Sequence, residues 1–160
     1  NADNYTPTDE TLIPTGKIES VEGTPLDFRK ALAIGERIPD KDATKTDDCK
    51  TATLGYDHNF VINGWGRSHG EDLLFAGRLK DPKSGRVMEI HTDQPGIQFY
   101  SGNFLKAQKG KGDKTYPFRG AVCLETQHFP DSVNHGNFPS TILKPGETYK
   151  TTTVHKFSAE

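Results

Sequence analysis

The sequence lacks any apolar stretch close to the ~20 residues that a membrane-spanning helix requires. Its first residues from Asn1 also lack the basic and apolar regions of a signal peptide. Basic and acidic residues number 20 and 22, so no positive charge excess is available to attract nucleic acids or anionic membranes. We therefore expect a soluble protein with a neutral or small ligand, and the sequence leaves its compartment open between the cytoplasm and a periplasmic or secreted location.

Motifs for metals, phosphates and serine nucleophiles are also absent. The two cysteines, Cys49 and Cys123, stand in no CxxC or ligand-spaced pattern, and two free thiols are a better interpretation than one disulfide. The six histidines form no zinc pattern, and no nucleophile elbow is present. The sequence therefore predicts neither a metal nor a cofactor.

Helical periodicity is missing too, because no long segment repeats apolar residues at the spacing of one helix face. Mean hydropathy is low at −0.73, but nine Phe, five Tyr and one Trp argue against disorder. Sixteen glycines and ten prolines divide the chain into short segments, which is typical of an all-β protein. The strands that we expect are 17–21, 59–62, 72–79, 86–92, 97–101, 121–127 and 147–157. Such a set predicts an antiparallel β-sandwich.

Three connecting segments carry recognisable turn or loop chemistry. Residues 81–85 read Asp-Pro-Lys-Ser-Gly, which predicts a turn that joins strands 72–79 and 86–92 into a hairpin. The polar run 40–48 is expected to be a solvated loop. In 106–114 lysines alternate with glycines without the spacing of a phosphate-binding loop, so we expect the mobile tip of a hairpin there.

Strand alternation singles out three polar side chains. In 121–127 the two-residue period separates Val122 and Leu124, which suit a core, from Glu125, which would line a cleft or face solvent. A carboxylate in a cleft can act in proton transfer. Gln98 likewise alternates with apolar neighbours and could offer its amide to a hydroxyl group, or be an ordinary half-exposed side chain. Asp57 stands at the start of another strand. Its carboxylate could bind hydroxyl groups, or it could equally cap a turn.

Several blocks of the sequence, in order and at matching spacing, resemble those of the galactose mutarotase (aldose 1-epimerase) family. The blocks are residues 10–16, 23–29, 56–60, 81–86, 95–105, 123–131 and 138–149. The resemblance covers essentially the whole chain but only about the second half of a family member. It implies that residues 1–160 are the carboxy-terminal part of one large antiparallel β-sandwich with a carbohydrate cleft, and that the amino-terminal part is absent from this chain.

The resemblance also implies roles for the three polar residues. Glu125 matches the general base that removes a proton from the anomeric hydroxyl of an aldohexose such as galactose or glucose. Asp57 and Gln98 match residues that bind the sugar. An acid protonates the ring oxygen while the base acts, so that the ring opens and recloses as the other anomer, with no cofactor or metal.

The family's acid, a histidine, belongs to its amino-terminal half, and no segment here resembles the block that carries it. His58 and His128 should not be taken as substitutes for it. We therefore expect this chain alone to be inactive or nearly so, with the amino-terminal part of the same enzyme as its partner. The alternatives are a non-catalytic carbohydrate-binding module and, with little support, an interaction domain in which 106–114 binds an acidic partner.

Overall fold

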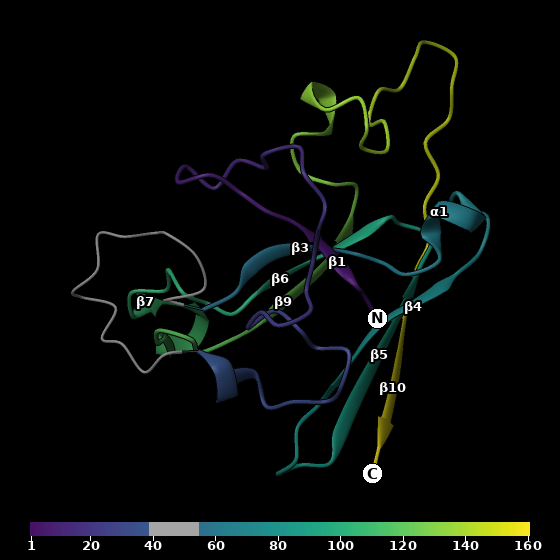
Figure 1. The fold of residues 1–160 in the computed structure, drawn as a ribbon. Coiled ribbons are helices and arrows are strands. Elements are labelled where there is room, and N and C mark those ends of the chain that lie inside the picture. The colour runs from purple at the N-terminus through teal and green to yellow at the C-terminus, as the bar shows by residue number, and fades with distance from the viewer. Residues whose placement is uncertain (39–54) are drawn as a thin grey trace.

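The computed structural model describes residues 1–38 and 55–160, and within these ranges the strands form three antiparallel sheets (Figure 1). The first sheet has the order β2-β1-β3-β6-β9, the second has the order β10-β5-β4, and β7 pairs with β8. The strands are β1 Asn4–Thr6, β2 Glu19–Ser20, β3 Asp57–Val61, β4 Leu74–Lys80, β5 Arg86–Thr92, β6 Gly96–Tyr100, β7 Gln108–Lys109, β8 Thr115–Tyr116, β9 Cys123–Gln127 and β10 Thr153–Ala159.

Helical structure in the described ranges is short. It consists of α1 Trp65–Ser68 and the 3₁₀ turns η1 Ile34–Arg37, η2 Lys111–Asp113 and η3 Ser132–Asn134. None of these helices is long and apolar enough to cross a membrane. The all-β prediction is confirmed.

The core lies between the two larger sheets. Alternate residues of β3 and β6, including Phe60, Ile97 and Phe99, are buried against Ile90 and Ala76 of the second sheet. The second sheet crosses the first at a steep angle and extends beyond it toward the C-terminus (Figure 1). This arrangement of two packed sheets is the expected β-sandwich.

An aromatic cluster fills one end of this core. Tyr56 stacks on Phe99 with ring centroids 5.0 Å apart, and Phe28 meets both rings edge-on at 5.1 and 5.6 Å. Edge-to-face and offset contacts add to the stabilisation that burial of the rings already provides. The cluster therefore holds β3 and β6 against the segment that carries Phe28.

A chain of threonine hydroxyls joins the two sheets at one corner. The Thr153 hydroxyl of β10 lies 2.7 Å from that of Thr126 in β9 and 2.9 Å from that of Thr92 in β5. Thr92 is completely buried and the other two threonines are partly buried, so the hydroxyl of Thr92 finds its partner within the protein. The edge of the first sheet is thereby tied to the second.

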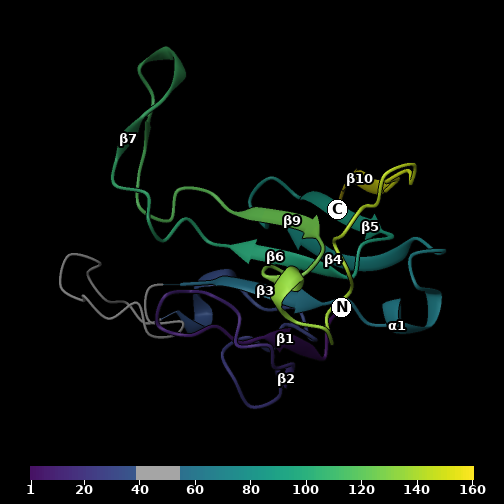
Figure 2. The ribbon, with the colours of Figure 1, turned by 90° about the horizontal axis from the view of Figure 1, so that it is seen from above.

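The expected hairpin is confirmed as β4 and β5, which pair from Leu74↔Thr92 to Lys80↔Val87. The Asp81 carboxylate accepts hydrogen bonds from the backbone N–H groups of Lys83 and Ser84, and Gly85 has a φ of +71°. This is the turn chemistry that the sequence indicated. The segment 106–114 is likewise part of a hairpin, β7–β8, which projects away from the two sheets (Figure 2).

Other strand predictions were less accurate. The strand expected over 147–157 is wrong for 147–152, because β10 begins at Thr153. The backbone N–H of Thr152 donates instead to a carboxylate oxygen of Asp93 at 2.7 Å. Strand β1 was not predicted, since its three residues before Pro7 are too short to show a period. The loop expected at 40–48 lies outside the described residues.

Gly96 of β6 permits a close approach of side chains over the sheet. A Cβ atom there would lie 2.5 Å from Asn59 Oδ1 and 3.0 Å from Phe129 Cδ1. We expect Gly96→Ala to lower the free energy of unfolding by roughly 1–3 kcal/mol, because the added methyl group overpacks the site. Urea unfolding measures this change.

Gly77 in β4 is the matched control, because a Cβ atom added there meets nothing within 4 Å. Gly77→Ala should leave stability unchanged or raise it slightly. Equal losses of stability in the two variants would contradict the packing described at Gly96.

Candidate functional site

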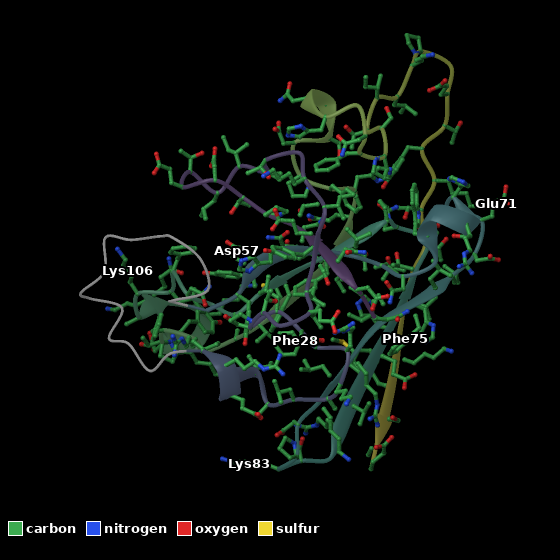
Figure 3. The ribbon with its side chains drawn as sticks, viewed as in Figure 1. Phe28, Asp57, Glu71, Phe75, Lys83 and Lys106 are labelled. Carbon is green, nitrogen blue, oxygen red and sulfur yellow. The ribbon has the colours of Figure 1, made fainter. Side chains whose placement is uncertain are left out.

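Three adjacent strands bring the predicted site residues together. Asp57 lies on β3, Gln98 on β6 and Glu125 on β9, and β6 pairs with both of the other strands. Gln98 is directly opposite Glu125, while Asp57 is opposite Tyr100. The strand period therefore places these side chains on one face of the sheet. Figure 3 shows Asp57 on the opposite side of the sheet from the core residue Phe28.

A hydrogen bond fixes the orientation of the Gln98 amide. Gln98 Nε2 donates to Asp57 Oδ1 at 2.8 Å. An ionised carboxylate only accepts hydrogen bonds, so the nitrogen of the amide must face Asp57. Gln98 Oε1 is buried and accepts no hydrogen bond within the described part of the chain. The pair therefore leaves one buried acceptor without a donor among the described residues.

A small hollow opens beside this pair. It has a volume of about 50 Å³ and is lined by Thr6, Thr8, Leu12, Pro14, Asp57, Asn59, Gln98 and Pro130. Typical ligand pockets measure about 300–1,000 Å³. The hollow is therefore too small to be an enclosed ligand pocket, and its lining residues form a shallow floor on this face of the sheet.

A buried polar pair supports this floor. Asn59 and Thr6 are 3% and 1% exposed, and Asn59 Nδ2 donates to Thr6 Oγ1 at 3.2 Å. Sequence reasoning missed both residues. Asn59 could have been found, because it lies two positions after Asp57 on the same strand and so shares its face. Thr6 gave no such signal, since β1 was not expected.

Glu125 is exposed on its face of β9, whereas Val122 and Leu124 pack against the core. The alternation predicted for 121–127 is therefore confirmed, although the strand itself begins at Cys123. Cys123 is a free, exposed thiol, and Cys49 lies outside the described residues. Within residues 1–38 and 55–160, no three His, Cys, Asp or Glu side chains gather as metal ligands.

His58 and His128 lie away from this face. His58 is opposite Phe99 on the core side of the sheet, where its ring meets Tyr5 edge-on and its Nδ1 accepts the Asp57 backbone N–H. His128 Nδ1 lies 2.9 Å from Gln94 Oε1. Burial lowers the pKa of both imidazoles. Their hydrogen bonds are therefore with the Asp57 backbone and Gln94, and not with the Gln98 side chain.

The burial of His58 predicts a pH dependence of stability. Because its pKa is lowered from 6.5, the unfolded chain binds this proton more readily than the folded protein does. The free energy of unfolding should therefore be unaffected by His58 well above pH 6.5 and fall as the pH drops below that value. Urea unfolding from about pH 8 to about pH 5 measures the slope, which His58→Gln should reduce.

The control is Gly77→Ala, which changes no titratable group and should leave the slope unaltered. An NMR titration of the ring protons that gives His58 a pKa of 6.5 or higher would contradict its burial on the core side.

Known proteins resemble this chain in both sequence and fold. A profile of the family described as aldose 1-epimerase matches residues 1–156. The human galactose mutarotase is 45% identical over 158 residues, which are 98% of this chain and 42% of the relative. The Escherichia coli (strain K12) aldose 1-epimerase is 34% identical over 161 residues, with 99% of this chain and 44% of that protein covered.

Solved structures of aldose epimerases also resemble this chain. The GalM/aldose epimerase homologue from C. elegans superposes with a TM-score of 0.78 and 31% identity, and covers 99% of this chain and 44% of its own. The galactose 1-epimerase from Lactobacillus acidophilus NCFM gives a TM-score of 0.74 and 27% identity. The chain thus spans less than half the length of the relatives that it matches. By sequence and fold, it belongs to the aldose 1-epimerase family.

Proposed function

We propose that the protein containing this chain is an aldose 1-epimerase that interconverts the α and β anomers of galactose, glucose or a similar aldose. In this proposal the 160 residues are the carboxy-terminal part of one β-sandwich domain. Family membership supports the reaction. The observation that carries the proposal is the placement of Asp57, Gln98 and Glu125 on one face of adjacent strands.

Glu125 is the base in the proposed reaction. Its exposed carboxylate removes the proton of the anomeric hydroxyl while an acid protonates the ring oxygen. The ring C–O bond breaks and the aldehyde forms, so that rotation about C1–C2 presents its other face. Reclosure with the reverse proton transfers then gives the other anomer. The protons balance, and the residues return to their starting states.

Asp57 and Gln98 bind sugar hydroxyls in this proposal. The hydrogen bond between them holds the Gln98 amide in one orientation, and the buried amide oxygen has no donor among residues 1–38 and 55–160. An aldose carries several hydroxyl donors in fixed relation to its anomeric carbon. Since β6 pairs Gln98 directly with Glu125, a hydroxyl bound at Gln98 would bring the sugar close to the base.

The acid comes from polypeptide beyond this chain in our proposal. The exposed apolar surface supports the presence of a covering part. Residues 140–152 are all exposed, and Ile142, Leu143 and Tyr149 are 66%, 54% and 60% accessible. Phe157 on the edge strand β10 is 75% accessible. Large apolar side chains left this accessible, one of them on an edge strand, are typical of a surface that another segment covers.

The test uses this chain joined to the residues of the human galactose mutarotase that precede the matched segment, called the joined protein below. Polarimetry of freshly dissolved α-galactose follows anomer interconversion. We expect the joined protein to exceed the spontaneous rate clearly and the 160-residue chain alone to match it. Glu125→Gln should lower kcat/KM of the joined protein by ~10²–10⁴-fold, the usual contribution of general acid–base catalysis.

Glu71→Gln is the matched control, because Glu71 is an exposed carboxylate near α1, and it should leave kcat/KM unchanged. A joined protein that binds galactose but never exceeds the spontaneous rate would instead indicate a carbohydrate-binding module. Full activity in Glu125→Gln would show that Glu125 is not the base.

A further inference from the structure

Two loops that are far apart in the sequence meet at the rim of the hollow. Leu12 and Pro14 come from residues 7–16, which follow β1, and Pro130 comes from residues 128–138, which follow β9. The width of the hollow beside Asp57 and Gln98 therefore depends on how these loops are held together.

The imidazole of His135 joins the two loops. Its Nε2 lies 3.1 Å from the Pro14 carbonyl oxygen and 3.1 Å from Asp131 Oδ2. Both oxygens are acceptors, so Nε2 must carry a hydrogen that it donates between them. Asn137 adds a second link, since its Nδ2 donates to the Gly16 carbonyl oxygen at 2.9 Å.

Gly16 allows the ring to approach this closely. Its φ is +81°, and a Cβ atom would lie only 2.6 Å from His135 Nδ1. Every other residue type would push the imidazole away from Pro14. The contact thus depends on a particular residue in each loop.

Each of the two loops is also held by contacts of its own. The ring of His135 lies against Phe138 at 5.0 Å between centroids, and Phe138 packs edge-on against Phe129 at 5.2 Å. On the other side, Asp9 Oδ1 accepts hydrogen bonds from the backbone N–H groups of Thr11 and Ile13. Because each loop is braced internally, the contacts that His135 and Asn137 make between the loops set their relative position.

We propose that His135 is a positioning residue for substrate binding, which clamps the loops 7–16 and 128–138 and so sets the rim of the sugar site. The inference rests on the proposed function of that site. His135 does not touch the sugar and takes no part in proton transfer. It acts through Pro14 and Pro130, whereas Glu125 is held independently by its pairing in β9.

The proposal predicts a separation of kinetic constants in the joined protein. His135→Ala should raise KM for galactose roughly 2- to 10-fold and leave kcat nearly unchanged, because a rim contact made equally in the ground and transition states is weakened. His135→Gln, whose amide can still donate to Pro14, should restore much of the lost binding. His69→Ala, an exposed histidine remote from these loops, should have no effect.

Gly16→Ala tests the same contact from the other loop. It should raise KM as His135→Ala does. The rise in KM in the double variant, which carries both changes, should be much smaller than the product of the two single rises, because both changes break the same contact. An equal fall of kcat, an unchanged KM or independent effects of the two changes would overturn the positioning role.

Hydrogen exchange separates failure of this inference from failure of the proposed function. The Thr15 backbone N–H donates to the Pro7 carbonyl within the first loop. In the joined protein, His135→Ala should speed exchange within 7–16 several-fold, whether or not the unsubstituted protein is an epimerase. Unchanged exchange would overturn the clamp itself, while faster exchange in a protein without epimerase activity would overturn only the proposed function and the role in sugar binding that rests on it.

Discussion

Burial of one face of β3, β6 and β9 is the constraint on which the rest of the structure depends. A shift of β6 by one residue would exchange Phe99 for Gln98 in the core, because side chains alternate between faces. Exposing an aromatic ring costs about 1.5–3 kcal/mol, and burying an unpaired amide costs about 1–3 kcal/mol more. The packing that stabilises the sandwich therefore also determines that Asp57, Gln98 and Glu125 share the opposite face.

The polar side chains on that face are held in place to different degrees. The pair of Asp57 and Gln98 is held by a hydrogen bond, and the buried pair Asn59 and Thr6 lies beside it on the same face. Glu125 is exposed, and the hollow beside the pair is too small to enclose a sugar. In our proposal, an exposed carboxylate beside this supported pair is one part of a binding site whose walls come from other polypeptide. The uncovered edge at β10 has the same explanation in our proposal.

The sequence was informative wherever short-range rules apply. Strand 86–92 was predicted with its observed bounds, because alternation and the Asp81 turn are local signals. The face of Glu125 followed from the same alternation. The link between Asp57 and Gln98 could not be predicted, since it depends on the register between strands distant in the sequence. Nor could the rim, where Pro14 and Pro130 meet only because the sandwich folds β1 and β9 into one sheet.

The central claim is that this polar face is the floor of a sugar site. Its most direct test is a titration of the joined protein with galactose, followed by NMR of the Gln98 side-chain amide and the Glu125 backbone amide. We predict saturable shifts at both positions, with little change at His58 on the core side. Shifts confined to the lysines of the β7–β8 hairpin, or no change at Gln98 and Glu125 on saturation, would contradict the account.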